Sequence, residues 1–282
     1  MLASSLVVTP VTGTFGAEIT GADLRRGFDD ESYARMRRAY NESGVIFLRD
    51  QHLDPAQFVA FGARFGPLTK SKLYPWKVAG HDELQEIRKE EGADKNFGGN
   101  WHADQSFRAH PIMGTGLIAR KVPAAGGDTA FINMAAAFDG LSDGLKQTVR
   151  GLRAVHTDAH LPTQIKRRAE LNRDRAPGDE VQPDEAIHPV VGRHPETHRS
   201  VLYINPFYTV RFEGWTQAES APLLRTLFEH ALRPEYFLRW RWEVGSIALW
   251  DNRQVLHYAV NDYPGGERVL HRLMVEGPFL QG

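Results

Sequence analysis

The chain has 282 residues, of which 41% are hydrophobic and 24% charged, and its formal net charge of −1 gives it no electrostatic reason to bind nucleic acid or an anionic membrane. No apolar run approaches the ~20 residues that cross a bilayer, and residues 1–8 lack the pattern of a secretory signal. The absence of cysteine excludes disulfides and thiolate ligands, so we expect a cytoplasmic protein in which nitrogen and oxygen hold any metal.

The first third of the chain alternates short β-prone runs with two helical patterns. Acidic residues precede each helical pattern, and glycine follows each, which is the usual placement of capping and terminating residues. In the second pattern, Phe58, Phe61 and Phe65 recur at helical spacing and are expected to face the core. The predicted elements are strands at 6–12 and 17–19, a helix over 29–43, a strand at 45–48 and a helix over 54–65.

Two middle segments lack a regular pattern. Residues 69–100 alternate lysines with acids, and they predict a mobile covering loop around one strand at 84–89; a solvated surface is an equally weighted interpretation. Residues 162–186 combine many charges with proline and glycine, which indicates a lid-like insertion outside the packed layers. Between these segments we predict strands at 113–120 and 129–133, joined by a turn, and one helix over 139–152.

The last third is predicted to be mostly strands. A helix over 216–231 starts with Thr216 and Glu219 in the spacing of a capping box. The strands are expected at 188–191, 201–204, 239–242, 247–250 and 268–275, the first two as a pair. Many short strands with few helices predict a β-sandwich or barrel flanked by helices. No linker or internal repeat is visible, so we predict a single domain over 1–282.

The stretch Trp101-His102-Ala103-Asp104 carries the clearest chemical signal. Alternate side chains on an extended backbone share a face, so His102 and Asp104 are expected to project toward one point. Two histidines and one carboxylate on one face of an octahedron are the ligands of non-heme Fe(II) oxygenases. Of the other histidines, His257 stands out because it lies in an apolar run, and His271 is its main rival. A hydrogen-bonded core histidine without a metal remains the commoner use of such a residue.

A larger set of motifs surrounds these residues. The set consists of Trp101-His102-Ala103-Asp104, Gly126-Gly127-Asp128-Thr129, Trp250-Asp251-Asn252-Arg253 with His257, and Arg268 with His271-Arg272. It resembles the TauD/TfdA family of Fe(II)/2-oxoglutarate-dependent dioxygenases, which includes taurine and aryloxyalkanoate dioxygenases, over nearly the whole chain. The resemblance implies a mainly β fold with flanking helices (α+β) and a double-stranded β-helix (jelly-roll) core.

The same resemblance implies the cofactors and their ligands. It makes His102, Asp104 and His257 the catalytic metal site for Fe(II), with the remaining positions taken by 2-oxoglutarate and O₂. It places the distal carboxylate of 2-oxoglutarate on Arg268, assisted by the hydroxyl of Thr129, and arginine is suited to pairing with a carboxylate. Related halogenases carry glycine or alanine in place of this aspartate, so the resemblance implies a hydroxylase.

The substrate is expected to be a small organic anion. Arg272 lies four residues from Arg268 and so shares its strand face, where it predicts a contact to a sulfonate, sulfate, phosphonate or carboxylate. Tyr74, Phe107 and Tyr208 predict an apolar or aromatic body for that substrate. Three positions depart from the taurine enzymes, so taurine itself is not expected. These are Ser71 in place of a histidine, Gly98 in place of an asparagine, and Tyr208 in place of a phenylalanine.

We therefore predict a homo-oligomeric dioxygenase, a dimer or tetramer, that hydroxylates a C–H bond and converts 2-oxoglutarate to succinate and CO₂. One alternative is a β-helix protein that binds a metal or ligand without turnover. Another is a zinc-dependent hydrolase, because histidine and aspartate also bind zinc. A buried Arg268 beside Thr129 distinguishes these readings, since a hydrolase has no use for a 2-oxo-acid clamp.

Overall fold

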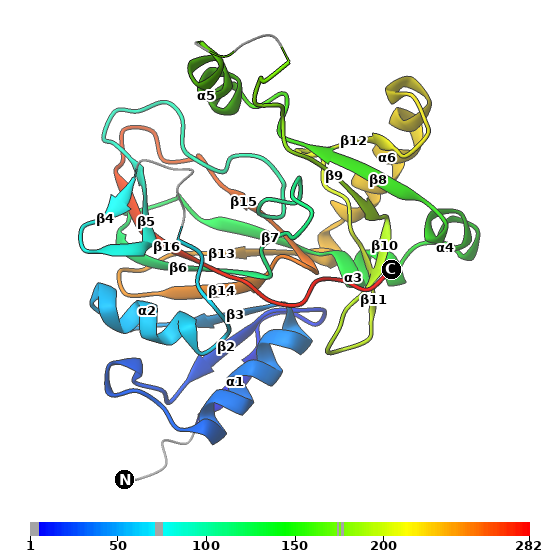
Figure 1. Cartoon of the computed structure of the whole chain (residues 1–282). Coiled ribbons are helices and arrows are strands. Elements are labelled where there is room, and N and C mark those ends of the chain that lie inside the picture. Colours follow the sequence, from blue (N-terminus) through cyan, green and yellow to red (C-terminus); the bar gives the residue numbers. More distant parts are fainter. Residues whose placement is uncertain (1–5, 71–75, 174, 176–177) are drawn as a thin grey trace.

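Two β-sheets packed face to face form the centre of the molecule (Figure 1). The computed structural model describes residues 6–70, 76–173, 175 and 178–282. Among these, the larger sheet contains β1 (Val7–Pro10), β2 (Ala17–Thr20), β3 (Val45–Leu48), β4 (Lys77–Val78), β5 (His81–Lys89), β6 (Gly114–Lys121), β14 (Ile247–Asp251) and β16 (Arg268–Val275). Their order across the sheet is β1-β2-β3-β14-β6-β16-β5-β4, with β2 and β3 parallel.

The second sheet contains β13 (Phe237–Trp240), β7 (Thr129–Asn133) and β15 (Val255–Ala259), with β7 in the middle and antiparallel to both neighbours. It packs on the larger sheet through one apolar cluster, in which the ring of Phe131 lies 5.8 Å from that of Phe47 and 5.5 Å from that of Trp250. Burial of each such side chain stabilises the fold by roughly 1.5–3 kcal/mol. The predicted mainly β fold with flanking helices is confirmed.

Two helices cover the outer face of the larger sheet (Figure 1). In α1 (Asp30–Ser43), the side chain of Asp29 accepts a hydrogen bond from the backbone of Ser32, and Gly44 ends the helix in the left-handed region at φ 73°. In α2 (Pro55–Ala63), Asp54 and Gln57 form a capping box. The three phenylalanines that were predicted to face the core are buried, which confirms the prediction from their helical spacing.

The predicted strand-turn-strand pattern over 113–133 is present, and it joins two different sheets. Its two strands exist as β6 and β7, but β6 pairs with β14 and β16 whereas β7 lies in the opposite sheet. The turn between them therefore crosses from one sheet to the other. Both strands are almost continuously apolar and buried, so neither shows the one-sided alternation that would reveal its sheet.

The predicted helix over 139–152 corresponds to α4 (Asp143–Arg150), and a short helix that was not predicted, α3 (Met134–Asp139), precedes it. Side chains cap both of them, Asn133 for α3 and Ser142 for α4. Gly140 lies between them, where a Cβ would collide with the hydroxyl of Tyr236. The cap at Ser142 therefore starts α4 later than the leucine spacing predicted.

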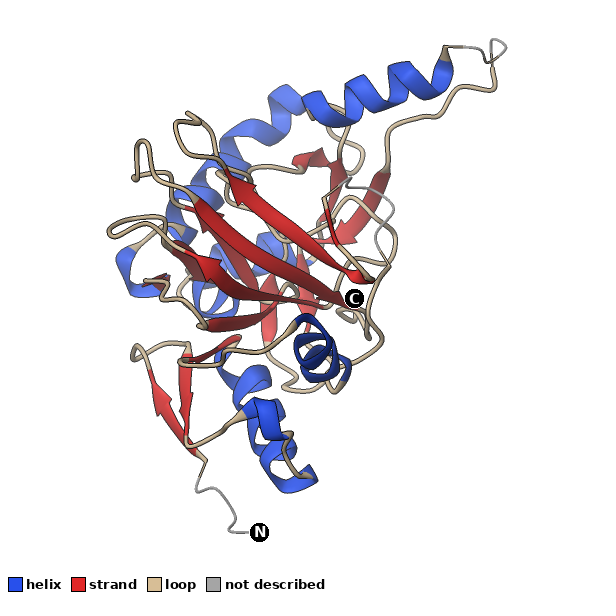
Figure 2. Ribbon diagram, turned by 90° about the vertical axis from the view of Figure 1, so that its left-hand side faces the viewer, coloured by secondary structure: helices blue, strands red, loops and turns tan. Residues whose placement is uncertain are grey.

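Residues 162–186 contain a helix that their charge pattern did not predict. This helix, α5 (Pro162–Asn172), projects from the end of the molecule (Figures 1 and 2), and Ile165 and Leu171 on it are 50% and 45% exposed. Because it buries little apolar surface, its sequence carries no apolar stripe. The expected loop at 69–100 likewise holds more strand than predicted, since β5 begins at His81. Ser71 and Tyr74 lie outside the described residues.

The segment after α5 corrects the pairing predicted for residues 188–191 and 201–204. Residues 188–189 belong to β9 (Glu185–Pro189), which pairs with β8 (Arg153–Thr157), and β8 also pairs with β12 (Thr209–Phe212). The hairpin predicted there is formed instead by β10 (Val191–Arg193) and β11 (Ser200–Leu202). The predicted capping box at Thr216 is confirmed at the start of α6 (Gln217–Ala231). Short 3₁₀ turns occur at Leu24–Arg26 and Pro234–Tyr236.

None of the helices in the described part of the chain has the length and apolar character that crossing a membrane requires.

Candidate active site

Backbone pairing brings His102 next to His257. The amide of His102 donates to the carbonyl of His257 (3.2 Å), and the amide of His257 donates to the carbonyl of His102 (2.9 Å). This isolated antiparallel bridge attaches the 102–104 segment to β15. As a result, the imidazole centroids lie 4.1 Å apart although the residues are distant in the sequence.

Asp104 completes a buried group of three donors. Nε2 of His102 lies 3.6 Å from Oδ1 of Asp104, and Nε2 of His257 lies 3.9 Å from Oδ2. The three ligand atoms lie within 4.8 Å of one another. Within the described ranges, no other three histidine, cysteine, aspartate or glutamate side chains meet in this way. Two imidazoles and one carboxylate suit Fe(II), with positions left open on the other side.

The protonation of these groups also suits a metal. The carbonyl of Asn100 accepts from Nδ1 of His102 (2.7 Å), which leaves the lone pair of Nε2 for a metal. Burial lowers the pKa of His257 well below its ordinary value, so this imidazole is neutral. Burial alone would raise the pKa of Asp104, but the guanidinium of Arg272 and the contact with His102 hold that pKa far below its ordinary range. Neutral histidines and an ionised carboxylate are the forms that bind Fe(II).

An inner cavity beside these donors contains a buried cation. Its lining includes His102 and His257 together with Thr129 and Arg268. Arg268 is 4% exposed and donates through a terminal nitrogen to the hydroxyl of Thr129 (3.1 Å), while its Nε has no hydrogen-bond partner among the described residues. Among the described residues, no carboxylate forms an ion pair with Arg268. Burial lowers the pKa of Arg268. A buried guanidinium without a counter-ion is suited to an incoming carboxylate.

Arg272 lies on the same face of β16, close to Asp104. One of its terminal nitrogens is 3.5 Å from Oδ1 of Asp104, and Oε1 of Gln85 accepts hydrogen bonds from Nε (2.9 Å) and the other terminal nitrogen (2.5 Å). Gln85 was not predicted, although its register position opposite Arg272 in β5 is the signal that would find it. His271 faces away and accepts a hydrogen bond from Arg120, so it does not join the group.

An outer cavity of about 520 Å³ opens onto His102 and Asp104. Phe207 and Tyr208 form an aromatic part of its wall, and Gly98 leaves room beside the His102 ring. Phe107 packs behind Tyr208, with ring centroids 5.0 Å apart, in a small cluster with Leu161. The remaining lining residues are Lys95, Asn96, Phe97, Gly99, Asn100, Leu161, Pro162, Gln164, Tyr258 and Asn261.

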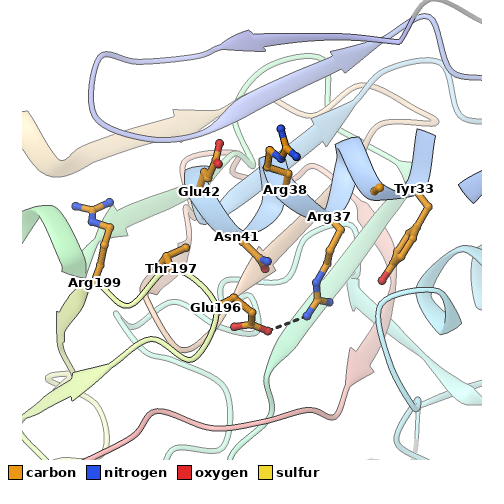
Figure 3. Close-up of a pocket in the computed structure, with 9 residues that line it drawn as sticks. Tyr33, Arg37, Arg38, Asn41, Glu42, Glu196, Thr197 and Arg199 are labelled. Carbon is orange, nitrogen blue, oxygen red and sulfur yellow. Dashed lines mark hydrogen bonds and ion pairs between the residues drawn. The ribbon is translucent and has the colours of Figure 1, made fainter. Parts of the chain in front are cut away.

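A separate cleft of about 690 Å³ lies between α1 and the turn that joins β10 to β11 (Figure 3). It contains none of the predicted ligands. Arg37 at its base is paired with Glu196 (3.0 Å), and Arg199 at its edge is paired with Asp139 (2.8 Å). Since these two arginines already have anionic partners and the donor group lies elsewhere, the candidate active site is formed by the two cavities that His102 lines.

Comparison with known proteins decides the family. The family model described as "Taurine catabolism dioxygenase TauD, TfdA family" matches residues 8–274. The chain belongs to the TauD/TfdA family. An alkylsulfatase of Acinetobacter baylyi is 34% identical over 98% of this chain and 87% of its own length. An alpha-ketoglutarate-dependent sulfate ester dioxygenase of Pseudomonas putida is 35% identical over 98% of this chain and 91% of its own length.

Solved TauD/TfdA structures agree. The crystal structure of a taurine dioxygenase from Burkholderia xenovorans matches with a TM-score of 0.81 and 35% identity, over 99% of this chain and 91% of that chain. This confirms the jelly-roll core, and membership of the TauD/TfdA family confirms an oxidoreductase that uses Fe(II), 2-oxoglutarate and O₂. The alternatives of a non-catalytic binding protein and a zinc hydrolase are set aside. The expected small anionic substrate agrees with the sulfate ester dioxygenase.

Proposed function

We propose that this dioxygenase hydroxylates an alkyl sulfate ester at the carbon that bears the sulfate oxygen. The observation that carries the proposal is Arg272, a cation only 5% exposed that lines the inner cavity and lies 3.5 Å from Asp104, which lines the outer cavity. A sulfate ester remains an anion at any physiological pH. The names of the two relatives that act on sulfates support this choice.

In this proposal, His102, Asp104 and His257 hold the Fe(II). The donor set fits the ion in number, chemistry and protonation. When bound together with 2-oxoglutarate and O₂, the iron supplies the oxidant, while 2-oxoglutarate becomes succinate and CO₂. The side chains of the chain have three tasks: holding the metal, holding the co-substrate and orienting the sulfate ester.

Arg268 and Thr129 bind the co-substrate. The guanidinium of Arg268 pairs with the distal carboxylate of 2-oxoglutarate, and the Thr129 hydroxyl supports the same oxygen. Thr129 itself accepts a hydrogen bond from Nε1 of Trp242 (2.9 Å), so its own hydrogen is available to the carboxylate. The burial of Arg268 strengthens this pairing because water does not compete for either charge.

Arg272 holds the sulfate, and the outer cavity holds the alkyl chain. Gln85 orients the guanidinium through a neutral oxygen, so this contact adds no second negative charge beside that of Asp104. The alkyl chain extends along Phe207 and Tyr208. The carbon next to the ester oxygen then gains a hydroxyl group, and the hydroxylated ester collapses to an aldehyde and hydrogen sulfate.

The test is succinate release in the presence of Fe(II), 2-oxoglutarate and O₂ with each of three anions. Octyl sulfate and octanesulfonate carry the same alkyl chain, and phenoxyacetate carries an aryl group. We expect octyl sulfate to give the highest kcat/KM and equal amounts of succinate, octanal and sulfate. Gln85→Glu gives Arg272 an anionic partner that competes with the sulfate for the guanidinium. We expect it to raise the KM for octyl sulfate about 10-fold, as if the substrate had lost one hydrogen bond to a charged group.

Faster turnover of phenoxyacetate than octyl sulfate would contradict the assignment of the substrate while leaving the reaction class intact. An unchanged KM for octyl sulfate in Arg272→Gln would contradict the role of Arg272.

A further inference from the structure

A chain of hydrogen bonds leads from β14 to the carboxylate of the donor group. Nε1 of Trp250 donates to Oδ1 of Asn252 (3.0 Å), and Nδ2 of Asn252 donates to the hydroxyl of Thr115 (2.9 Å). That hydroxyl donates to Oδ2 of Asp104 (2.6 Å). Thr115 is completely buried, and the other three side chains are at most 5% exposed. Bulk water therefore does not compete for these bonds.

The direction of each hydrogen bond follows from the donors present. Oδ1 of Asn252 receives two N–H groups, from the indole of Trp250 and from the backbone of Asp104 (3.2 Å). Turning the amide round would place its NH₂ against both of these donors, so the NH₂ faces Thr115. Because the threonine oxygen accepts that bond, its own hydrogen is directed to Asp104.

The larger sheet holds the members of this chain at fixed positions. Thr115 in β6 lies directly opposite Trp250 in β14, and these strands are neighbours near the centre of the sheet (Figure 1). The backbone amide of Asn252 donates to the carbonyl of Met113, just before β6 (2.9 Å). A hydroxyl carried on a central strand is positioned more rigidly than one on a loop.

The number of positions around the metal makes the binding mode of Asp104 important. Two imidazoles and one carboxylate oxygen leave three positions of an octahedron, which a chelating 2-oxo acid and O₂ fill. Binding through both carboxylate oxygens would remove one of these three. Thr115 donates to Oδ2, which also lies 3.9 Å from Nε2 of His257, whereas Oδ1 has no hydroxyl partner and lies nearer to His102 (3.6 Å) and Arg272 (3.5 Å).

We propose that Thr115, oriented by Asn252, is a positioning residue that restricts Asp104 to metal binding through Oδ1 alone. This inference rests on the proposed function, in which Asp104 is a metal ligand. In the sequence, Asn252 belongs to the motif Trp250-Asp251-Asn252-Arg253, whereas Thr115 carries no signal, because a single threonine in an apolar strand has no recognisable pattern.

Four variants separate this role from a purely structural one. Thr115→Val removes the hydroxyl at nearly constant volume, and Thr115→Ser retains it. Asn252→Asp keeps the shape but replaces the NH₂ donor with an acceptor, which turns the Thr115 hydrogen away from Asp104. Ser220→Ala is the control, because it removes a completely buried hydroxyl, bonded to Phe212 and Thr216, in the distant helix α6.

The readouts are the visible spectrum of bound Co(II), whose intensity reports coordination number, and the Kd values for Co(II) and for 2-oxoglutarate. Near-UV circular dichroism verifies the fold of each variant. We expect Thr115→Val and Asn252→Asp to change the Co(II) spectrum and to weaken binding of the metal or the co-substrate by about 10–100-fold. Thr115→Ser and Ser220→Ala should match the parent protein.

A parental spectrum and parental Kd values in Thr115→Val would overturn the proposal. If Thr115→Val does not fold, either of two results would overturn it equally: a Thr115→Ser variant as defective as Asn252→Asp, or an Asn252→Asp variant identical to the parent. A parent protein that binds no Co(II) would instead contradict the proposed function.

Discussion

At the scale of single residues, two arginines of β16 share a face but differ in their partners. Arg268 has no carboxylate partner within the described residues, whereas Arg272 already contacts Asp104 and Gln85. Arg268 is therefore suited to an anion that binds and leaves in each catalytic cycle. Arg272 is suited to an anion that lies next to the metal.

Arg268→Gln should raise the KM for 2-oxoglutarate. Removing one partner of a buried, hydrogen-bonded charge pair costs about 2–5 kcal/mol, which is roughly 30-fold or more in affinity. The measurement is the initial rate of succinate release against 2-oxoglutarate concentration. Arg239→Gln is the matched control, because this arginine is 43% exposed and pairs with Asp128 and Asp262 outside the cavity. An equal change of KM in both variants would contradict the clamp.

The sequence predicted those site residues whose placement follows from their spacing along one strand. Alternation on an extended backbone predicted that His102 and Asp104 project together, and it placed Arg268 and Arg272 on one face with His271 turned away. Gln85 and Thr115 were not predicted, because their roles arise from cross-strand partners that spacing along one segment does not reveal.

At the scale of elements, strands and helices with strong local signals were predicted well. Capping residues set the ends of α1, α2 and α6, and these elements lie where their patterns indicated. The errors concern partners and bounds: the strand predicted at 188–191 divides between β9 and β10, which pair with different strands, and the helix predicted over 139–152 begins only after the cap at Ser142. Such choices depend on contacts with distant parts of the chain, which local patterns do not contain.

Strand β16 also carries a pH-dependent contribution to stability. Burial and the neighbouring Arg120 lower the pKa of His271 from 6.5 to about 4, and Nδ1 of His271 accepts a hydrogen bond from Arg120 (3.1 Å). The unfolded chain therefore binds a proton at a higher pH than the folded protein does. The contribution is complete above about pH 6.5 and is lost as the pH falls toward about 4.

Comparing the urea unfolding midpoints of the parent and His271→Gln from pH 7.5 to pH 4.5 tests this prediction. We expect the midpoint of the parent to fall more steeply with decreasing pH than that of the variant. Parallel pH profiles would show that His271 titrates alike in both states.

At the scale of the whole molecule, a buried ionic cluster joins the larger sheet, the β10–β11 hairpin and α1. Asp251 accepts hydrogen bonds from Arg253 (2.7 and 2.8 Å) and from Nε2 of His194 (2.9 Å). Arg253 also pairs with Glu196 (2.9 Å), which in turn pairs with Arg37 of α1 (3.0 Å). The cluster fixes the turn between β14 and β15, and His257 lies in β15.

Arg253→Met should therefore destabilise the protein strongly, because it leaves the fully buried carboxylate of Asp251 without its cation. We expect a loss of about 3–5 kcal/mol in the free energy of unfolding, measured by urea denaturation. Arg239→Met breaks two ion pairs that are more exposed than those of Arg253. It should lower the free energy of unfolding by about 1 kcal/mol or less. Equal losses in the two variants would refute the special role of the buried cluster.

The central claim is that a rolled β-core brings two imidazoles and one carboxylate to a single iron, with 2-oxoglutarate held beside it. The most direct measurement is the anaerobic visible spectrum after addition of Fe(II) and 2-oxoglutarate. We predict a weak charge-transfer band that disappears in Asp104→Ala and persists in His271→Gln. No band with iron, or a band of full strength with Zn(II) or in Asp104→Ala, would contradict the account.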